Sequence, residues 1–267
     1  MLKSVDLRDI INIAKEAGEA AMSIYKKDFE VCYKEDESPL TKADLKANKI
    51  ILSGLKKLYP SVPLISEESK TEPFEVRKHW EYYWCIDPID GTKEFVKKSD
   101  EFTINIALMH KNKPVLGVVY APALTLLYAA KKNEGAHKYE NGTKKVLLKE
   151  KLKSKRLNVA TSKSHLDSKT EEFIKSLLSS YTINQTAIGS SLKICLIAEG
   201  KMDLYPRCGK TMEWDTAAAH AVLKEAGKDI YVYSEKISSL AYIEKNINLK
   251  SLKYNKKDLT NPYFIAI

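Results

Sequence analysis

Two aspartates stand three residues apart at the end of an apolar run, in the stretch WCIDPIDGTKEFV at 84–96. Asp87 precedes a proline, which biases its backbone toward an extended form, so its carboxylate is expected to project from a strand end. Asp90 follows one turn later, and the Ile89 carbonyl between the two aspartates adds a third oxygen. Hard cations take several oxygen ligands, so this spacing suits one ion. Asp-Pro and Asp-Gly are also common turn dipeptides, and the motif alone fits a plain turn equally well.

Other acids stand at the ends of predicted elements, and each alone has an ordinary explanation. Glu67 and Glu68 follow the strand-like PLIS, where a surface pair is usual. Asp215 stands at a predicted helix start, where aspartate is a favoured N-cap. Asp44 and Thr41 form a T-x-x-D capping pattern. Phosphoryl chemistry commonly uses two or more hard cations near one phosphate, so acids that converge from several element ends would serve it.

The residues directly after Asp90 point toward the same chemistry. Gly91 and Thr92 follow the acids at the start of a possible helical turn. Backbone N–H groups at such a position can hold phosphate oxygens. The combination of acids and turn therefore favours a phosphoryl site over a plain turn.

The composition is that of an ordinary globular protein. Its 267 residues allow one large domain or two moderate ones, and 44% of them are hydrophobic and 30% charged. The N-terminal MLKSVDLRDI shows no apolar stretch of signal-peptide length. The longest uncharged run, 114–130, is interrupted by two prolines and a glycine, so it predicts two buried strands and no membrane span.

Charge and cysteine usage argue against some classes of function. The net charge of +9 comes mostly from lysine, and a solvated lysine-rich surface is the favoured explanation. The densest basic run, 144–156, lacks the interleaved aromatic residues of a nucleic-acid platform, although a basic surface also attracts anionic small molecules. The absence of C-x-x-C pairing predicts reduced core or near-core thiols in a cytoplasmic protein at Cys32, Cys85, Cys195 and Cys208.

Hydrophobic periodicity predicts the elements that must position these groups. In the first half we expect helices over 5–27 and 42–58, and strands over 62–66, 82–87, 102–110, 114–121 and 125–130. Asn141-Gly142 is a hairpin signal, and Gly200 and Gly227 stand where helices commonly end. In the second half we expect strands over 157–161, 181–186, 202–206 and 230–234, and helices over 168–180, 190–199 and 215–226.

This order of elements predicts an α/β protein in two parts. The part over 1–155 reads as α+β, and the part over 156–267 reads as α/β because strands and helices alternate there. The sequence has no low-complexity linker, so the two parts are expected to share an interface. A cleft between them is a natural ligand site.

Three motifs together resemble the inositol monophosphatase superfamily of magnesium-dependent, lithium-sensitive phosphatases. They are SEES at 66–69, DPIDGT at 87–92 and WDTAAAHAVLKEAG at 214–227, and SPLTKADLKAN at 38–48 is similar to that family's upstream motif. The resemblance spans essentially the whole chain. It implies a layered α-β-α-β-α sandwich, with most metal ligands in 1–155 and the nucleotide-binding residues and last metal ligand in 156–267.

Within the superfamily, the residues after DPIDGT resemble the branch of 3'(2'),5'-bisphosphate nucleotidases. Inositol monophosphatases typically continue with one residue and then NF, whereas this chain has KEFVKKSDEFTINIAL at 93–108. The runs at 113–130, 162–165 and 188–207 resemble the same branch. The resemblance implies hydrolysis of adenosine 3',5'-bisphosphate to AMP and phosphate, which clears a by-product of sulfate assimilation.

Carried over position by position, the resemblance implies a site with two or three Mg²⁺ ions. Glu67, Asp87 and the Ile89 carbonyl would hold one ion, and Asp87, Asp90 and Asp215 would hold another. Such ions neutralise phosphoryl oxygens and lower the pKa of the attacking water, so no phosphoenzyme is needed.

The resemblance also implies roles in catalysis and substrate binding. Asp44, paired with Thr92, and Glu67 would orient and deprotonate the attacking water. Lys193 would face the second phosphate, and Arg207 is a further candidate for that task. The full set of implied substrate contacts is Glu67, Ile89, Asp90, Gly91, Thr92, Ser162, His165, Gly189, Lys193 and Asp215.

Two other functions stay open at this point. One is an inositol-phosphate or sugar-bisphosphate phosphatase of the same superfamily. The other, from a different class, is an inactive basic module that binds nucleotides or nucleic acid, although such a protein would have no need to retain four metal carboxylates. We expect a small-molecule nucleotide bisphosphate as partner, no nucleic acid and no membrane span. The sequence leaves open the oligomeric state and a peripheral association with the inner face of the plasma membrane.

Overall fold

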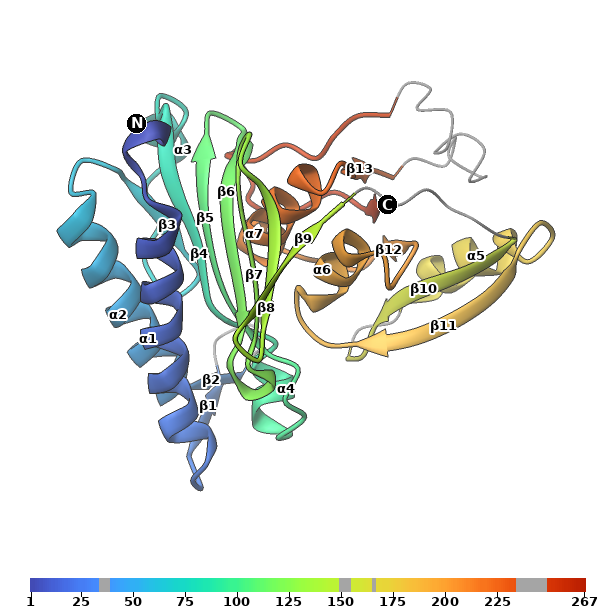
Figure 1. The fold of residues 1–267 in the computed structure, drawn as a ribbon, viewed down its shortest axis with the longest axis horizontal. Helices are drawn as coiled ribbons and strands as arrows, with labels where there is room; N and C mark the ends of the chain where they lie inside the picture. Colours follow the sequence, from blue (N-terminus) through green and yellow to red (C-terminus); the bar gives the residue numbers. More distant parts are fainter. Residues whose placement is uncertain (34–38, 149–154, 165–166, 234–248) are drawn as a thin grey trace.

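The fold is built around a seven-stranded sheet in the first half of the chain (Figure 1). We describe it from a computed structural model, over residues 1–33, 39–148, 155–164, 167–233 and 249–267. The strands follow one another in chain order, and all neighbours are antiparallel except the first pair. They are β3 (Leu64–Ser66), β4 (Tyr82–Asp90), β5 (Thr103–His110), β6 (Lys113–Ala121), β7 (Leu126–Lys131), β8 (Gly135–Glu140) and β9 (Thr143–Leu147).

The central strands are apolar on both faces because helices cover both sides of the sheet. Every residue of β7 and all but the last of β5 are buried, which is the pattern of strands with two covered faces. The helices α1 (Leu7–Tyr25) and α2 (Lys42–Leu58) pack on one face, and α6 (Leu192–Glu199) and α7 (Glu213–Glu225) lie on the other.

The first two helices begin at side-chain caps. The Asp6 carboxylate accepts the Arg8 backbone N–H at 2.9 Å at the start of α1. At the start of α2, Thr41 and Asp44 form the reciprocal capping box that the sequence predicted. The buried residues of α1 recur at helical spacing, from Ile10 to Tyr25, so this helix presents one apolar face to the sheet.

The second half adds two smaller sheets and an outer helix. The strands β10 (Arg156–Ser162) and β11 (Thr182–Ile188) run parallel, and α5 (Ser168–Leu177) connects them. In a second, antiparallel sheet, β14 (Phe264–Ala266) lies between β12 (Tyr205–Arg207) and β13 (Ile230–Val232). Apolar side chains of α5 pack with those of β10 and β14, so the outer helix closes the last layer.

The layers therefore run helix, sheet, helix, sheet, helix, as the resemblance implied (Figure 1). Short elements complete the described chain. They are a 3-10 turn at Leu2–Ser4, β1 (Val31–Tyr33), β2 (Pro39–Thr41), α3 (Phe74–Arg77), α4 (Thr92–Val96) and a 3-10 turn at Pro122–Leu124. The expected boundary near residue 155 stays a prediction, and the residues just before it, 149–154, lie outside the described chain.

Most predicted elements are confirmed, and the differences lie at their ends. The Asn141-Gly142 hairpin joins β8 to β9, and both residues have the positive φ that this two-residue turn requires. The strand predicted to end at Asp87 continues to Asp90 through an irregular register. The helix predicted from Asp215 begins earlier, at Glu213. The strand β14 was not predicted, because three residues are too short a run to show a period.

The cysteine prediction is confirmed for three positions and wrong for one. Cys85, Cys195 and Cys208 are buried free thiols, whereas Cys32 is exposed. It lies on β1, which pairs with β2 in a small sheet separate from the seven-stranded one, and no described residue buries its side chain there.

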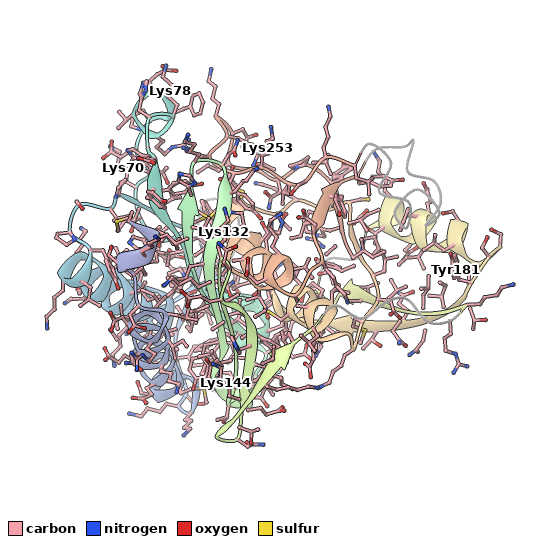
Figure 2. All side chains as sticks on the ribbon, turned by 45° about the horizontal axis from the view of Figure 1, so that its top comes forward. Lys70, Lys78, Lys132, Lys144, Tyr181 and Lys253 are labelled. Atoms are coloured by element: carbon pink, nitrogen blue, oxygen red, sulfur yellow. The ribbon has the colours of Figure 1, made fainter. Side chains whose placement is uncertain are left out.

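Lysine side chains give the protein its basic surface. The labelled lysines in Figure 2 project outward and are exposed, namely Lys70, Lys78, Lys132, Lys144 and Lys253. This agrees with the solvated surface favoured from the sequence. No helix in the described chain is long and apolar enough to cross a membrane.

A buried histidine in α7 makes stability depend on pH. His220 lies between the Tyr254 hydroxyl, at 2.8 Å, and the Asp229 carboxylate, at 2.5 Å. Burial lowers the pKa of His220 and outweighs the opposing effect of Asp229. Hydrogen bonds and charges from His220 and Lys224 overcome burial and hold the pKa of Asp229 well below its usual range. Both groups therefore take up protons more readily when the chain is unfolded.

We expect the free energy of unfolding to fall as the pH drops below about 6.5, the usual pKa of an unfolded histidine. His220→Asn should make the free energy of unfolding less dependent on pH between about pH 7 and pH 5, because asparagine does not titrate. Urea unfolding at several pH values measures it, with the exposed His79→Asn as a control that keeps the wild-type slope. A wild-type chain that gains stability toward low pH would contradict the inference.

Candidate active site

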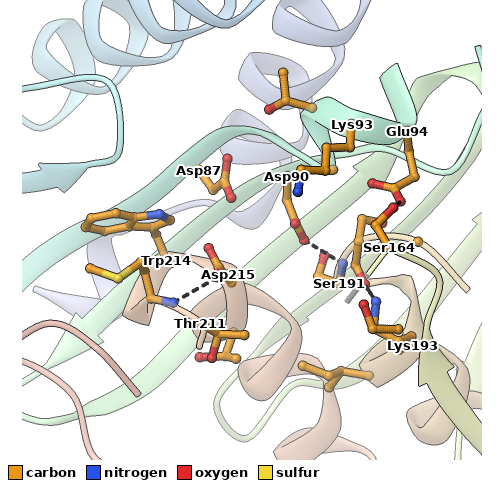
Figure 3. A pocket seen from close by; sticks show the side chains of 18 of the residues that line it. Asp87, Asp90, Lys93, Glu94, Ser164, Ser191, Lys193, Thr211, Trp214 and Asp215 are labelled. Atoms are coloured by element: carbon orange, nitrogen blue, oxygen red, sulfur yellow. Dashed lines mark hydrogen bonds between the residues drawn. The ribbon is translucent and has the colours of Figure 1, made fainter. Parts of the chain in front are cut away.

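A pocket of about 470 Å³ lies where the two halves of the chain meet (Figure 3). It is lined by the end of β4, the start of α4, the turn between β11 and α6, and the start of α7. This volume is in the range of small-molecule sites. The cleft that the sequence predicted between the halves is therefore present.

The end of β4 brings Asp87 and Asp90 into this pocket. Asp87 is 1% exposed, and its Oδ1 accepts the Ile89 N–H at 3.1 Å. Asp90 Oδ2 accepts the Ser191 N–H at 2.5 Å, from the other half of the chain. One oxygen of each carboxylate is thus fixed by a backbone donor, which orients the group.

The turn after Asp90 requires a glycine. Gly91 has a φ of 88°, a left-handed conformation that side chains other than glycine rarely adopt. A Cβ there would also lie 3.2 Å from the Glu101 carbonyl oxygen. The tight turn predicted from Asp-Pro and Asp-Gly is therefore the same feature that brings Asp87 and Asp90 together.

Thr92 and Asp44 are brought together although 48 residues separate them. The Thr92 hydroxyl lies 3.3 Å from Asp44 Oδ1 and 3.2 Å from the Ile89 carbonyl oxygen. The other oxygen of Asp44 accepts the N–H and hydroxyl of Thr41, so Asp44 is both a helix cap and the partner of Thr92. Burial raises the pKa of Asp44.

Asp215 enters from α7, as the third residue of that helix rather than its N-cap. Its Oδ2 accepts the Met212 N–H at 2.8 Å. The residues 255–261, which we call the C-terminal bracket, surround this helix start. Asn261 donates to the Met212 carbonyl oxygen at 2.6 Å, and the fully buried Glu213 accepts the Asn255 N–H at 2.6 Å.

The acids of the pocket raise one another's pKa. Burial is the largest cause for Asp87, and the charges of Glu67, Asp90 and Asp215 add to it. Burial also raises the pKa of Asp90 to about 6, against the nearby Lys193 charge. The pKa of Asp215 is raised well above its usual value by burial and by Asp90. Crowded carboxylates of this kind are stabilised by cations.

The donor set fits hard cations. It consists of the Glu67, Asp87, Asp90 and Asp215 carboxylates and the Ile89 carbonyl, all oxygen donors in the lining of one pocket. Oxygen-only ligands suit Mg²⁺ and similar ions. Among the described residues, no group of three Asp, Glu, His or Cys side chains is close enough together to hold a metal ion. The donors therefore line one cavity but are not arranged as a complete coordination shell.

Basic residues occupy the same pocket. Lys193 is 6% exposed, and its ammonium donates to the carbonyl oxygens of Ile188, at 3.0 Å, and Ser190, at 2.7 Å. Burial lowers the pKa of Lys193 to about 8. Arg207 is buried as well and donates to the Lys210 carbonyl oxygen at 3.1 Å. The pocket therefore combines several acids with two buried cations, Lys193 and Arg207.

The structure brings nearly all the predicted site residues to this pocket. Asp44 is the exception within the described chain, since it lies behind Thr92 and not in the lining. His165 lies outside the described residues. The predicted residues in the lining are Glu67, Asp87, Ile89, Asp90, Gly91, Thr92, Ser162, Gly189, Lys193, Arg207 and Asp215.

Sequence reasoning missed several residues of the lining, among them Glu94, Ser164 and Ser191. The sequence offered one signal for them: Glu94 belongs to the KEF segment that departs from the inositol monophosphatase pattern. The two serines lie in the runs 162–165 and 188–207 that resemble the nucleotidase branch, but the sequence did not single them out within those runs.

The family of the chain follows from comparison with known proteins. A family model described as the inositol monophosphatase family matches residues 5–263. This chain belongs to the inositol monophosphatase family. Within the family, the 3'(2'),5'-bisphosphate nucleotidase CysQ of Salmonella typhimurium is 45% identical over 232 residues, which cover 86% of this chain and 92% of that protein. The protein of the same name from Haemophilus influenzae is 36% identical and covers 98% of this chain and 92% of its own length.

Solved structures of family members have the same fold. CysQ from Bacteroides thetaiotaomicron superposes with a TM-score of 0.82 at 38% identity and covers 97% of this chain and 96% of that one. The Thermotoga maritima IMPase has a TM-score of 0.72 at 24% identity, over 96% of this chain and 89% of that chain. The similarity to the Thermotoga maritima protein shows the shared fold alone.

Proposed function

We propose that this chain is a 3'(2'),5'-bisphosphate nucleotidase, which hydrolyses adenosine 3',5'-bisphosphate to AMP and phosphate. The observation that carries the proposal is that one pocket holds both a group of acids suited to cations, with Asp87 buried among them, and the buried Lys193 and Arg207. A substrate with two phosphates needs both kinds of group. Relatives named as this nucleotidase, 36% to 45% identical, support it.

Glu67, Asp87, the Ile89 carbonyl, Asp90 and Asp215 would hold Mg²⁺, in a set of two or three ions. When bound, the ions supply charge neutralisation at the phosphoryl oxygens and make the attacking water more acidic. The chain keeps these acids oriented through backbone donors, such as the Ser191 N–H at Asp90.

Thr92 and Asp44 would together take a proton from the attacking water. The Thr92 hydroxyl is in reach of Asp44 Oδ1 at 3.3 Å. Burial raises the pKa of Asp44, which makes its carboxylate a better proton acceptor near neutral pH. Water would then form a bond to phosphorus as its proton passes by way of Thr92 to Asp44, the bond from phosphorus to the 3'-oxygen would break, and that oxygen would take up a proton from solvent water.

The second phosphate would lie toward Lys193 and Arg207. Both side chains are 6% exposed, so an anion that contacts them is shielded from bulk water, where charge pairing is weak. Ser162 and Gly189 line the same cavity. His165, an expected contact, lies outside the described residues.

A substrate panel tests the proposal. We expect Mg²⁺-dependent phosphate release from adenosine 3',5'-bisphosphate with a kcat/KM at least about tenfold above those for inositol 1-phosphate and fructose 1,6-bisphosphate. Chelation of the metal should abolish release. Comparable or faster release from either of the other two substrates would assign the chain to another phosphatase activity. The ion count, lithium sensitivity and the link to sulfate assimilation stay predictions.

A further inference from the structure

An acidic segment of the first half holds two loops of the second half against the phosphate turn. The phosphate turn is the turn Asp87–Thr92, and the acidic segment follows it in the chain. We call its two glutamates, Glu94 and Glu101, the acidic clasp. In contact with it are the residues just after β10, with Ser164, and the turn after β11, with Gly189. Figure 3 shows Glu94 and Ser164 pointing toward each other from these two sides.

Glu94 makes the closest side-chain contact of the clasp. Its carboxylate is buried, at 6% residue exposure, and accepts the Ser164 hydroxyl at 2.5 Å. The two residues are 70 positions apart in the chain. The same side chain lies against the phosphate turn, since a Cβ on Gly91 would lie 3.2 Å from Glu94 Oε2. Glu94 therefore touches both the turn and the opposite loop.

Glu101 fastens the neighbouring turn. Its carboxylate accepts the Gly189 N–H at 2.8 Å and the Lys163 ammonium at 3.2 Å. The backbone approach is close, because a Cβ on Gly189 would lie 2.6 Å from the Glu101 carbonyl oxygen and 2.8 Å from Glu94 Cγ. Only glycine fits at this point, so the loop packs directly against Glu94 and Glu101.

We propose that Glu94 is a positioning residue for nucleotide recognition, which holds the end of β10, through Ser164, at a fixed distance from the phosphate turn. This inference rests on the proposed function. A bisphosphate nucleotide spans both loops, whereas a small monophosphate ester engages only the turn and its ions. Contacts remote from the reacting phosphate lower the barrier only while their position is held. The KEF segment thus acts on specificity without being part of the reacting centre.

Two variants test this role by the change in specificity. In Glu94→Ala and in Ser164→Ala, the KM for adenosine 3',5'-bisphosphate should rise by on the order of tenfold, as expected for a lost charge-assisted hydrogen bond. The kcat/KM for p-nitrophenyl phosphate should fall less than that for the nucleotide, so that the ratio of the two values changes. Glu94→Gln keeps an acceptor for Ser164 and should recover most of the loss. The double variant should be no worse than either single one, because both remove the same contact.

Amide hydrogen exchange gives a second readout. Exchange at 162–164 should become faster in both alanine variants and stay at the wild-type rate in Glu172→Gln, a matched control on the exposed face of α5. An equal loss on both substrates, or a Ser164→Ala chain that keeps the wild-type KM, would overturn the proposal. If the wild-type chain does not hydrolyse the nucleotide at all, the proposed function is wrong, and the exchange rates still decide whether Glu94 holds the end of β10.

Discussion

Asp90→Asn is expected to lower Mg²⁺-dependent phosphate release by on the order of a thousandfold or more. Asp90 is proposed to hold an ion and is one of the acids that line the pocket. Asparagine keeps the shape of the side chain and an oxygen that can accept the Ser191 N–H, which Asp90 accepts at 2.5 Å. It removes the negative charge that a cation needs. The fold should therefore survive while turnover is lost.

Melting temperatures distinguish a loss of metal binding in this variant from a loss of its fold. Neighbouring acids and burial disfavour the charge on Asp90, so without metal the variant should unfold at the same temperature as wild type or a higher one. Added Mg²⁺ should raise the melting temperature of wild type and raise that of the variant less. Asp28→Asn, an exposed acid after α1, serves as control and should behave as wild type. A variant with near wild-type turnover would remove Asp90 from the metal site.

Gly117→Ala is expected to destabilise the protein by about 3 kcal/mol or more. Gly117 lies on β6 where α7 crosses the sheet, and a Cβ there would lie 2.1 Å from the Ala218 carbonyl oxygen and 2.8 Å from Ala221 Cβ. The obstacle is helix backbone, which no change of side-chain rotamer can move. The helix would have to shift outward, and Asp215 stands on the same helix. Activity should fall together with stability.

Urea unfolding and phosphate release measure the two effects. Gly54→Ala on α2 is a matched control, because a Cβ there would meet only the flexible side chain of Ile13, at 2.9 Å. That variant should cost less than about 1 kcal/mol, since alanine also favours the helix. If Gly117→Ala proved as mild as Gly54→Ala, the close packing of α7 on β6 would be wrong.

Local sequence patterns predicted much of the fold and the acids that are proposed to bind metal. The apolar run before Asp87 predicted β4, and helical spacing predicted α1 to within two residues at each end. The acids of one turn, Asp87 and Asp90, could be placed because the chain itself holds them near each other. Period and turn chemistry act over a few residues, so such features can be read from sequence.

The rest depends on packing between distant segments. Asp90 meets Ser191 across 101 residues, and Glu94 meets Ser164 across 70. No local period encodes such pairs. The orientation of Lys193 was also beyond the sequence, since the carbonyls of Ile188 and Ser190 that hold its ammonium belong to a turn whose shape depends on the clasp. Long-range contacts of this kind require the folded chain.

The C-terminal bracket has a consequence for how the protein is made. Residues 255–261 fix the start of α7, through Asn261 at the Met212 carbonyl and Asn255 at Glu213. Chains emerge from the ribosome from the N-terminus and begin to fold as they do so. The acids of β4 are therefore synthesised long before the segment that secures Asp215. We expect a truncated chain that lacks the bracket to leave the start of α7 without these hydrogen bonds, so the phosphatase should gain activity only once this segment has been made.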